Sequence, residues 1–168
     1  MMTETTFTHE KLKEVDLFSM FAKNEMVIKK IADICTTKSF KQGRTIIKEG
    51  DLGDELFIIL EGEIDILKKT LQDEAYTVTT LSSEMGGIYV GELALIDKDT
   101  RSATVLAKSD CQCLVMKRRD FLIFGDKNPQ VGLAITRAIA GEISARLRKS
   151  NADVITLFSA LVDEISAE

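Results

Sequence analysis

The spacing of apolar residues divides the chain into a short helical beginning, a strand-rich middle and a long helical end. Between Met26 and Ile34 apolar residues recur every three or four positions, which predicts an amphipathic helix, and Asn24 is a typical residue to cap it. From residue 40 to about residue 116, short apolar runs alternate with turns that contain glycine and aspartate. The pattern predicts a mainly β domain with flanking helices.

The C-terminal stretch carries a seven-residue apolar repeat. Pro129 follows a capping asparagine, and nothing from there to about Ile165 forbids a single helix of roughly 50 Å. Positions seven apart are Leu133, Ala140, Leu147, Val154 and Leu161, and three residues after the first four stand Thr136, Ile143, Ser150 and Leu157. Such a repeat predicts a seam between paired helices and hence a homodimer; a helix packed once across its own β domain is the alternative. A bend near Gly141 is compatible with the low helix propensity of glycine.

These elements fit one domain with an appendage in a chain of 168 residues. We expect an N-terminal tail over residues 1–16, frayed to about Glu10. A single domain is expected over residues 17–126, and a C-terminal dimerisation helix over residues 127–168. The loop over residues 82–87 contains two glycines, and its conformation does not follow from the sequence.

The composition of the chain argues against several classes of function. The net charge of −5 argues against direct nucleic-acid binding. No apolar run approaches the ~20 residues that cross a bilayer, and the polar N-terminus lacks a secretion signal. The cysteines, Cys35, Cys111 and Cys113, form no disulfide framework and are expected to be core thiols in a reducing cytoplasm. With His9 as the only histidine, we expect no metal site, no cofactor and no catalysis, and a cupin-type enzyme is disfavoured.

The stretch most suited to binding a ligand runs from residue 91 to residue 104. Its apolar turn 93–96 would expose N-terminal amides, which attract anions, and Gly91 permits close approach of the backbone. The guanidinium of Arg101 can bind a phosphate in a two-pronged geometry. The carboxylate of Glu92 can accept hydrogen bonds from a sugar hydroxyl. Together these groups suit a ligand with a single phosphate and a ribose.

This stretch resembles the phosphate-binding cassette of the cyclic-nucleotide-binding domain family. In that family Gly-Glu and three apolar residues precede an arginine, a small residue and alanine; Thr100 stands here in place of the usual proline. A second similarity is the spacing of the turn glycines at positions 43, 50, 53 and 62. The resemblance covers about residues 17–161 and implies a double-stranded β-helix, a jelly-roll-like β-roll, with an N-terminal helix and a long C-terminal helix.

The resemblance also implies roles for individual residues. Glu92 would take the ribose 2′-hydroxyl and Arg101 the cyclic phosphate. The last helix is similar to the dimerisation helix of the bacterial catabolite-activator family, in which small polar residues meet the adenine. The other implied ligand-binding residues are Gly91, Leu93, Ala94, Ser102 and Ala103 in the cassette and Ser150 and Asn151 on the last helix. We expect cAMP to be favoured, since the adenine amino group can donate to a Ser or Asn oxygen; cGMP stays open, because the Ser102 hydroxyl can also serve a guanine.

The sequence thus predicts a non-catalytic regulatory module of cytoplasmic signal transduction. It would bind a 3′,5′-cyclic nucleotide and convert occupancy into a rearrangement of the C-terminal helix. One alternative is the sensory half of a larger transcription factor, channel or kinase regulator, whose effector the sequence does not identify. Another is a structural β-roll dimer with an unused pocket.

Overall fold

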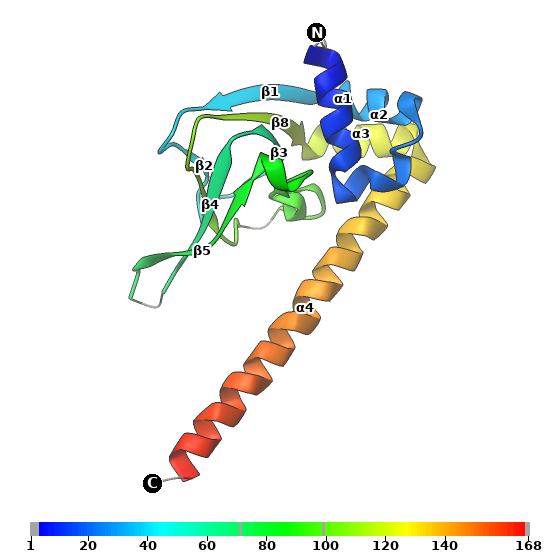
Figure 1. Cartoon of the computed structure of the whole chain (residues 1–168). Coiled ribbons are helices and arrows are strands. Elements are labelled where there is room, and N and C mark those ends of the chain that lie inside the picture. The colour runs from blue at the N-terminus through cyan, green and yellow to red at the C-terminus, as the bar shows by residue number, and fades with distance from the viewer. Residues whose placement is uncertain (1–3, 71, 99, 167–168) are drawn as a thin grey trace.

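The computed structural model describes residues 4–70, 72–98 and 100–166. The helical segments are α1 (Glu4–Glu14), η1 (Asp16–Phe21), α2 (Glu25–Ala32), η2 (Ser83–Met85), η3 (Glu92–Leu95), α3 (Arg118–Lys127) and α4 (Pro129–Ser166). The strands are β1 (Cys35–Phe40), β2 (Thr45–Ile47), β3 (Glu55–Glu61), β4 (Glu63–Lys69), β5 (Ala75–Ser82), β6 (Tyr89–Val90), β7 (Thr104–Ala107) and β8 (Cys111–Lys117). Figure 1 shows α1, α2 and α3 grouped on one side of the strands, with α4 extending away from that group.

The strands form two antiparallel sheets, ordered β1-β8-β3-β6 and β2-β7-β4-β5. Within each sheet the neighbours pair in antiparallel register, as in Phe57 opposite Val115 and Ile64 opposite Ala107. The sheets enclose a core to which β3 and β8 contribute from one side and β2, β4 and β7 from the other. This arrangement confirms the predicted β-roll with flanking helices.

Strand β3 is buried on both faces. Alternate side chains, Phe57 and Ile59, enter the core between the sheets, while Leu56, Ile58 and Leu60 join a second core with the helices. A strand covered on both faces has no solvent side to carry polar residues, which explains its continuous apolar run. The second core also takes side chains from α1, η1, α2, α3 and the first turns of α4.

The prediction of an N-terminal tail frayed to about Glu10 is wrong for the residues that the structure describes, because Glu4–Glu14 form helix α1 and Phe7 packs against the second core. Helix α1 packs into the second core through Leu12, which is fully buried, as is Val15 just after it. The last turn of α1 rests against the loop before β6: a Cβ built on Gly87 would lie 2.3 Å from the backbone of Glu14 and Val15. Only glycine permits this approach. The loop 82–87 therefore packs against the end of the N-terminal helix through Gly87. The proposed division into three units at residues 16 and 126 stays a prediction.

Two predicted helices are present. Asn24 caps α2, its side chain accepting a hydrogen bond from the amide of Val27 at 3.2 Å. Helix α4 is a single helix of 38 residues that passes through Gly141 without interruption. Its first turns are buried at Gly132, Ile135 and Ile139, whereas every residue from 143 to 166 is exposed. None of the helices in the described part of the chain combines the length and apolar character that crossing a membrane requires.

Packing of α1 can be tested by truncating its core side chain. We expect Leu12→Ala to lower the free energy of unfolding by about 2–4 kcal/mol, because a fully buried leucine leaves a cavity. Urea denaturation measures the change. Met26→Ala is the control: it truncates a helical side chain that is 69% exposed and should cost within about 0.5 kcal/mol. Equal stability of the two variants would mean that α1 does not pack as described.

Candidate functional site

The backbone of the predicted binding stretch turns sharply after β6. Gly91 has a φ of +81°, in the left-handed region that favours glycine. A Cβ there would also lie 2.6 Å from Nη1 of Arg101 and 3.0 Å from the carbonyl oxygen of Glu55. The short helix η3 follows at once and buries Glu92, Ala94 and Leu95. Conformation and space therefore both require glycine at this position.

The guanidinium of Arg101 is fixed between two backbone carbonyls. Its Nη2 donates to the carbonyl oxygen of Glu55 at 2.7 Å, and its Nη1 donates to that of Gly91 at 3.3 Å. A Cβ built on Gly53 would lie 2.0 Å from Nε, so this glycine makes room for the arginine. Burial lowers the pKa of Arg101, opposed by the carboxylates of Glu55, Asp54 and Glu92. The side chain is thus held in place before any ligand binds.

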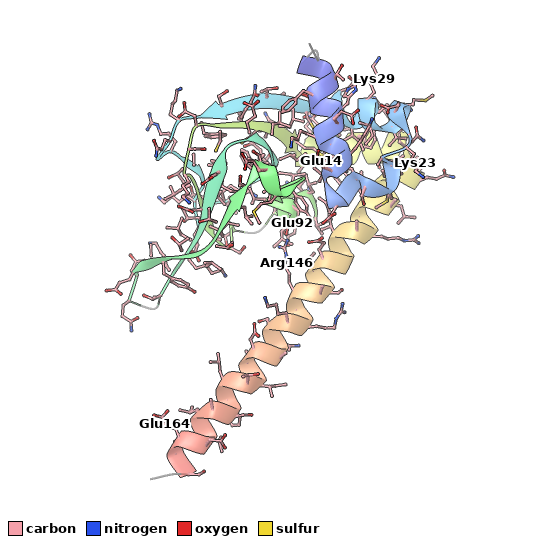
Figure 2. All side chains as sticks on the ribbon, in the orientation of Figure 1. Glu14, Lys23, Lys29, Glu92, Arg146 and Glu164 are labelled. Atoms are coloured by element: carbon pink, nitrogen blue, oxygen red, sulfur yellow. The ribbon has the colours of Figure 1, made fainter. Side chains whose placement is uncertain are left out.

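The carboxylate of Glu92 meets an arginine from the last helix. Glu92 is 4% exposed, the single buried charged side chain among the described residues. Its Oε1 accepts a hydrogen bond from Nη1 of Arg146 at 2.5 Å, across 54 positions of sequence. Nη2 of Arg146 donates to Glu142 at 3.3 Å, one turn earlier on α4. Figure 2 shows Glu92 and Arg146 facing each other between the β-roll and α4.

The surroundings favour the charged pair. Burial disfavours the charged form of Arg146, but the carboxylates of Glu92 and Glu142 outweigh it and raise the arginine's pKa. Burial raises the pKa of Tyr89 above its usual range, and the carboxylate of Glu142 adds to this effect. Tyr89 therefore remains a neutral phenol next to the pair.

A cavity of about 600 Å³ opens beside these groups. The charged residues Glu92, Arg101 and Arg146 line it, together with a set of apolar side chains. The apolar wall comes from β2, β4, β5 and β7 through Ile47, Ile66, Val78, Leu81 and Val105. Cavities of 300–1,000 Å³ with apolar walls and a few polar groups are typical of sites for small molecules.

The structure brings together all the residues predicted from the cassette. Those that line the cavity are Gly91, Glu92, Leu93, Ala94, Arg101, Ser102 and Ala103. The turn was predicted to expose its N-terminal amides. In the structure the amide of Ala94 donates a hydrogen bond to the carbonyl oxygen of Gly91 at 3.2 Å. Ser150 and Asn151 lie outside the cavity and are exposed, one turn beyond Arg146 on α4.

Arg146 is a charged residue of the site to which the sequence analysis assigned no role. Charged residues are frequent on exposed helices, and its partner Glu92 is far away in the sequence. The available signal was that Arg146 stands one turn before Ser150, so both project from nearby faces of the helix.

The cysteines take no part in the site. Burial raises the pKa of Cys35 and of Cys113 to about 12, so both remain protonated thiols at neutral pH. Cys111 and Cys113 lie in the core between the sheets, as predicted. Within the described ranges no three His, Cys, Asp or Glu residues are grouped so that they could hold a metal ion.

Comparison with known proteins agrees with this geometry. The model of the cyclic nucleotide-binding domain family matches residues 37–128, which include strands β2 to β8, most of β1 and the turn that begins at Gly91. The chain therefore belongs to the cyclic nucleotide-binding domain family.

Similar proteins are regulatory. The cAMP-dependent protein kinase regulatory subunit of Dictyostelium discoideum is 30% identical over 112 residues, which are 67% of this chain and 34% of that protein. The corresponding subunit of Aspergillus niger is 36% identical over 110 residues, 66% of this chain and 25% of that protein. The chain thus spans about a third or less of the length of these relatives.

Among solved structures, the Thermus thermophilus catabolite activator protein superposes with a TM-score of 0.73 and 26% identity, covering 84% of this chain and 62% of that one. The regulatory domain of Toxoplasma gondii PKA, solved with cAMP, gives a TM-score of 0.65 and 26% identity, covering 80% and 49%. The chain is a cyclic nucleotide-binding regulatory domain, related to the kinase regulatory subunits.

The contribution of the Glu92–Arg146 pair can be measured. We expect Arg146→Met to lower the free energy of unfolding by about 1–2 kcal/mol, because a buried carboxylate loses its guanidinium; the Arg146 side chain is 58% exposed, which limits the loss. A double-mutant cycle with Glu92→Gln, measured by urea denaturation, isolates the pairwise energy. Arg137→Met, an exposed arginine of α4 outside the cavity, is the control. A coupling energy near zero would show that the contact does not stabilise the fold.

Proposed function

We propose that the cavity binds a 3′,5′-cyclic nucleotide, with cAMP preferred to cGMP, and that the protein acts as a non-catalytic regulatory module. The observation that carries this proposal is the placement of Arg101 and Glu92 in one cavity of about 600 Å³. A guanidinium and a carboxylate that face the same space fit a ligand with an anionic end and a hydroxyl-bearing end.

The phosphate would bind at Arg101. Two of the five guanidinium N–H donors are used by the carbonyls of Glu55 and Gly91, and others remain for a cyclic phosphate. Ser102 and Leu93 also line the cavity, and the Ser102 hydroxyl and the Leu93 amide would add donors. Because the carbonyls and Gly53 already fix the arginine, little conformational freedom is lost on binding.

The ribose would bind at Glu92. Arg146 occupies one carboxylate oxygen, and a carboxylate accepts several hydrogen bonds, so the 2′-hydroxyl can donate to the other oxygen. Arg146 then positions the acceptor that reads the ribose. In this arrangement, the ligand and α4 share one carboxylate.

The base would lie along the apolar wall of β4 and β5, towards α4. Ser150 and Asn151 do not reach the cavity in this structure, so base recognition by them requires a movement of α4 or the helix of a second copy. Either residue can accept a hydrogen bond from the amino group of adenine, which is the basis of the proposed preference for cAMP.

The effect of ligand binding would be transmitted through α4. This helix is the longest element of the described chain, and its Arg146 contacts the site directly. We infer a homodimer in which α4 pairs along Ile143, Leu147, Val154, Leu157 and Leu161, all exposed in one copy. The matched parts cover 34% and 25% of the kinase regulatory subunits, so as an alternative we infer that the chain serves as the sensory part of a longer regulator. A cytoplasmic location stays a prediction.

Ligand binding is tested by calorimetry with cAMP, cGMP, 2′-deoxy-cAMP and cyclic di-GMP. We expect wild type to bind cAMP best and 2′-deoxy-cAMP poorly. Arg101→Ala should weaken binding of cAMP at least tenfold, since charge-assisted hydrogen bonds contribute about 1.5–3 kcal/mol each. Arg119→Ala removes an exposed arginine of α3 outside the cavity and should bind like wild type. Unchanged affinity in Arg101→Ala would overturn the assignment of the site.

The role of α4 is tested by mass in solution together with affinity. We expect Ser150→Leu to change the affinity for cAMP and to strengthen helix pairing, because it replaces a polar residue in the seam with an apolar one. Ser159→Leu places the same side chain elsewhere on the exposed part of α4, outside the seam, and should leave affinity unchanged. A monomer at micromolar concentration with and without cAMP, or an affinity indifferent to Ser150 and Asn151, would refute this part of the proposal.

A further inference from the structure

The guanidinium of Arg146 is shared between two carboxylates. Its Nη1 donates to Oε1 of Glu92 at 2.5 Å, and its Nη2 donates to Oε2 of Glu142 at 3.3 Å. Glu92 belongs to η3 and is 4% exposed, whereas Glu142 lies one turn before Arg146 on α4 and has a side chain that is 33% exposed. The second guanidinium nitrogen is thus bound by a glutamate of the same helix.

This pairing differs from the one that an arginine and a carboxylate favour. In a two-pronged pair, two parallel N–H groups bind both oxygens of one carboxylate, which adds energy and fixes the geometry. Such a pair at Glu92 would place an arginine N–H on each carboxylate oxygen. Here Nη2 is bound to Glu142 instead, and one oxygen of Glu92 carries no hydrogen bond from Arg146.

Tyr89 restrains Glu142 from the side of the β-roll. It lies in β6, three positions before Glu92, and lines the same cavity. Burial raises the pKa of its phenol, and the charge of Glu142 and a hydrogen bond between the two side chains raise this pKa further. Because the neutral phenol is the donor, the carboxylate of Glu142 accepts from both Tyr89 and Arg146.

The contacts connect two pairs of side chains whose spacing is fixed. Tyr89 and Glu92 flank the sharp turn at Gly91, and Glu142 and Arg146 are four positions apart on one face of α4. A guanidinium held from two directions has less freedom to rotate than one held by a single carboxylate. The orientation of Arg146 towards Glu92 therefore depends on Glu142.

We propose that Glu142 is a positioning residue of the nucleotide site: it limits Arg146 to one hydrogen bond with Glu92, so that the other oxygen of Glu92 stays open to the ribose 2′-hydroxyl, and Tyr89 holds Glu142 in place. This inference rests on the proposed function, since it assigns Glu92 to the ribose. It predicts two effects of opposite direction. Without Glu142, the Glu92–Arg146 pair becomes stronger, while recognition of the ribose becomes weaker.

Calorimetry with cAMP and 2′-deoxy-cAMP tests the effect on the ligand. Glu142→Ala should lower the ratio of the two affinities by roughly two- to tenfold, the effect of one hydrogen bond. Glu142→Gln keeps an oxygen that accepts from Nη2 and should stay close to wild type. Glu164→Ala, the control, removes an exposed carboxylate at the far end of α4 (Figure 2) and should leave the ratio unchanged. An unchanged ratio in Glu142→Ala, or an equal loss with alanine and glutamine, overturns the proposal.

Urea denaturation of the ligand-free protein tests the effect on the ion pair. A double-mutant cycle with Glu92→Gln and Arg146→Met gives their coupling energy. We expect this coupling to be larger in the Glu142→Ala background than in wild type, because the guanidinium can then bind both oxygens of Glu92. A coupling that stays equal or falls contradicts the proposal.

The cycle without ligand separates the two levels of the argument. A wild type that binds no cyclic nucleotide overturns the proposed function, and a wild type that binds cAMP and 2′-deoxy-cAMP equally overturns the ribose contact of Glu92. In both cases the coupling energy still decides whether Glu142 controls the pair. Wild-type discrimination that is unaffected by Glu142→Ala removes the positioning role alone.

Tyr89→Phe tests the remaining member of the group. The variant loses the hydroxyl and keeps the ring that packs against the second core. We expect the ratio of affinities to fall by less than in Glu142→Ala, and not to fall further when the two substitutions are combined, since both act through Nη2 of Arg146. Additive losses would show that Tyr89 does not act through Glu142.

Discussion

The contact on which the site depends is the hydrogen-bonded ion pair between Glu92 and Arg146. A carboxylate that is 4% exposed is unfavourable in a protein interior unless a charged partner compensates for lost hydration. Here the partner comes from α4, so the structure of the binding turn includes a residue 54 positions away. The pair joins the β-roll to the long helix, and both of its side chains line the cavity.

Arg101 is held in a different way. No carboxylate is hydrogen-bonded to it in the contacts described above; backbone carbonyls orient its guanidinium, and two glycines leave the space that it fills. Carbonyl oxygens fix the direction of the guanidinium but do not neutralise its charge, so the positive charge remains available to an anion. Glu92 and Arg101 therefore differ: Glu92 is paired with Arg146 of α4, whereas Arg101 is oriented by backbone carbonyls.

Several elements that position the site could be predicted from local signals in the sequence. The cap at Asn24, the turn at Gly91 and the proline that begins α4 each depend on neighbouring residues, and the structure has all three elements. Helix α1 was missed because a few apolar residues such as Leu12 lie among many charged ones, and its burial depends on the surface formed by other elements. The Glu92–Arg146 pair was missed because no local pattern relates two residues brought together only by the tertiary fold.

The continuity of α4 gives the ion pair a consequence beyond the cavity. The helix is continuous from the core, past Arg146, to its exposed apolar end, so a change in its direction at the site moves the distant end as well. A ligand shifts such an equilibrium only by its differential affinity for two states. The proposed nucleotide meets this requirement because its ribose and Arg146 share the carboxylate of Glu92. If binding strengthens the contact with Arg146, one direction of the helix is favoured; if it weakens the contact, the helix is released. Under the proposed function, either effect would change how the exposed apolar end of α4 meets another copy, and so would couple the chemistry of one carboxylate to association at the far end of the helix.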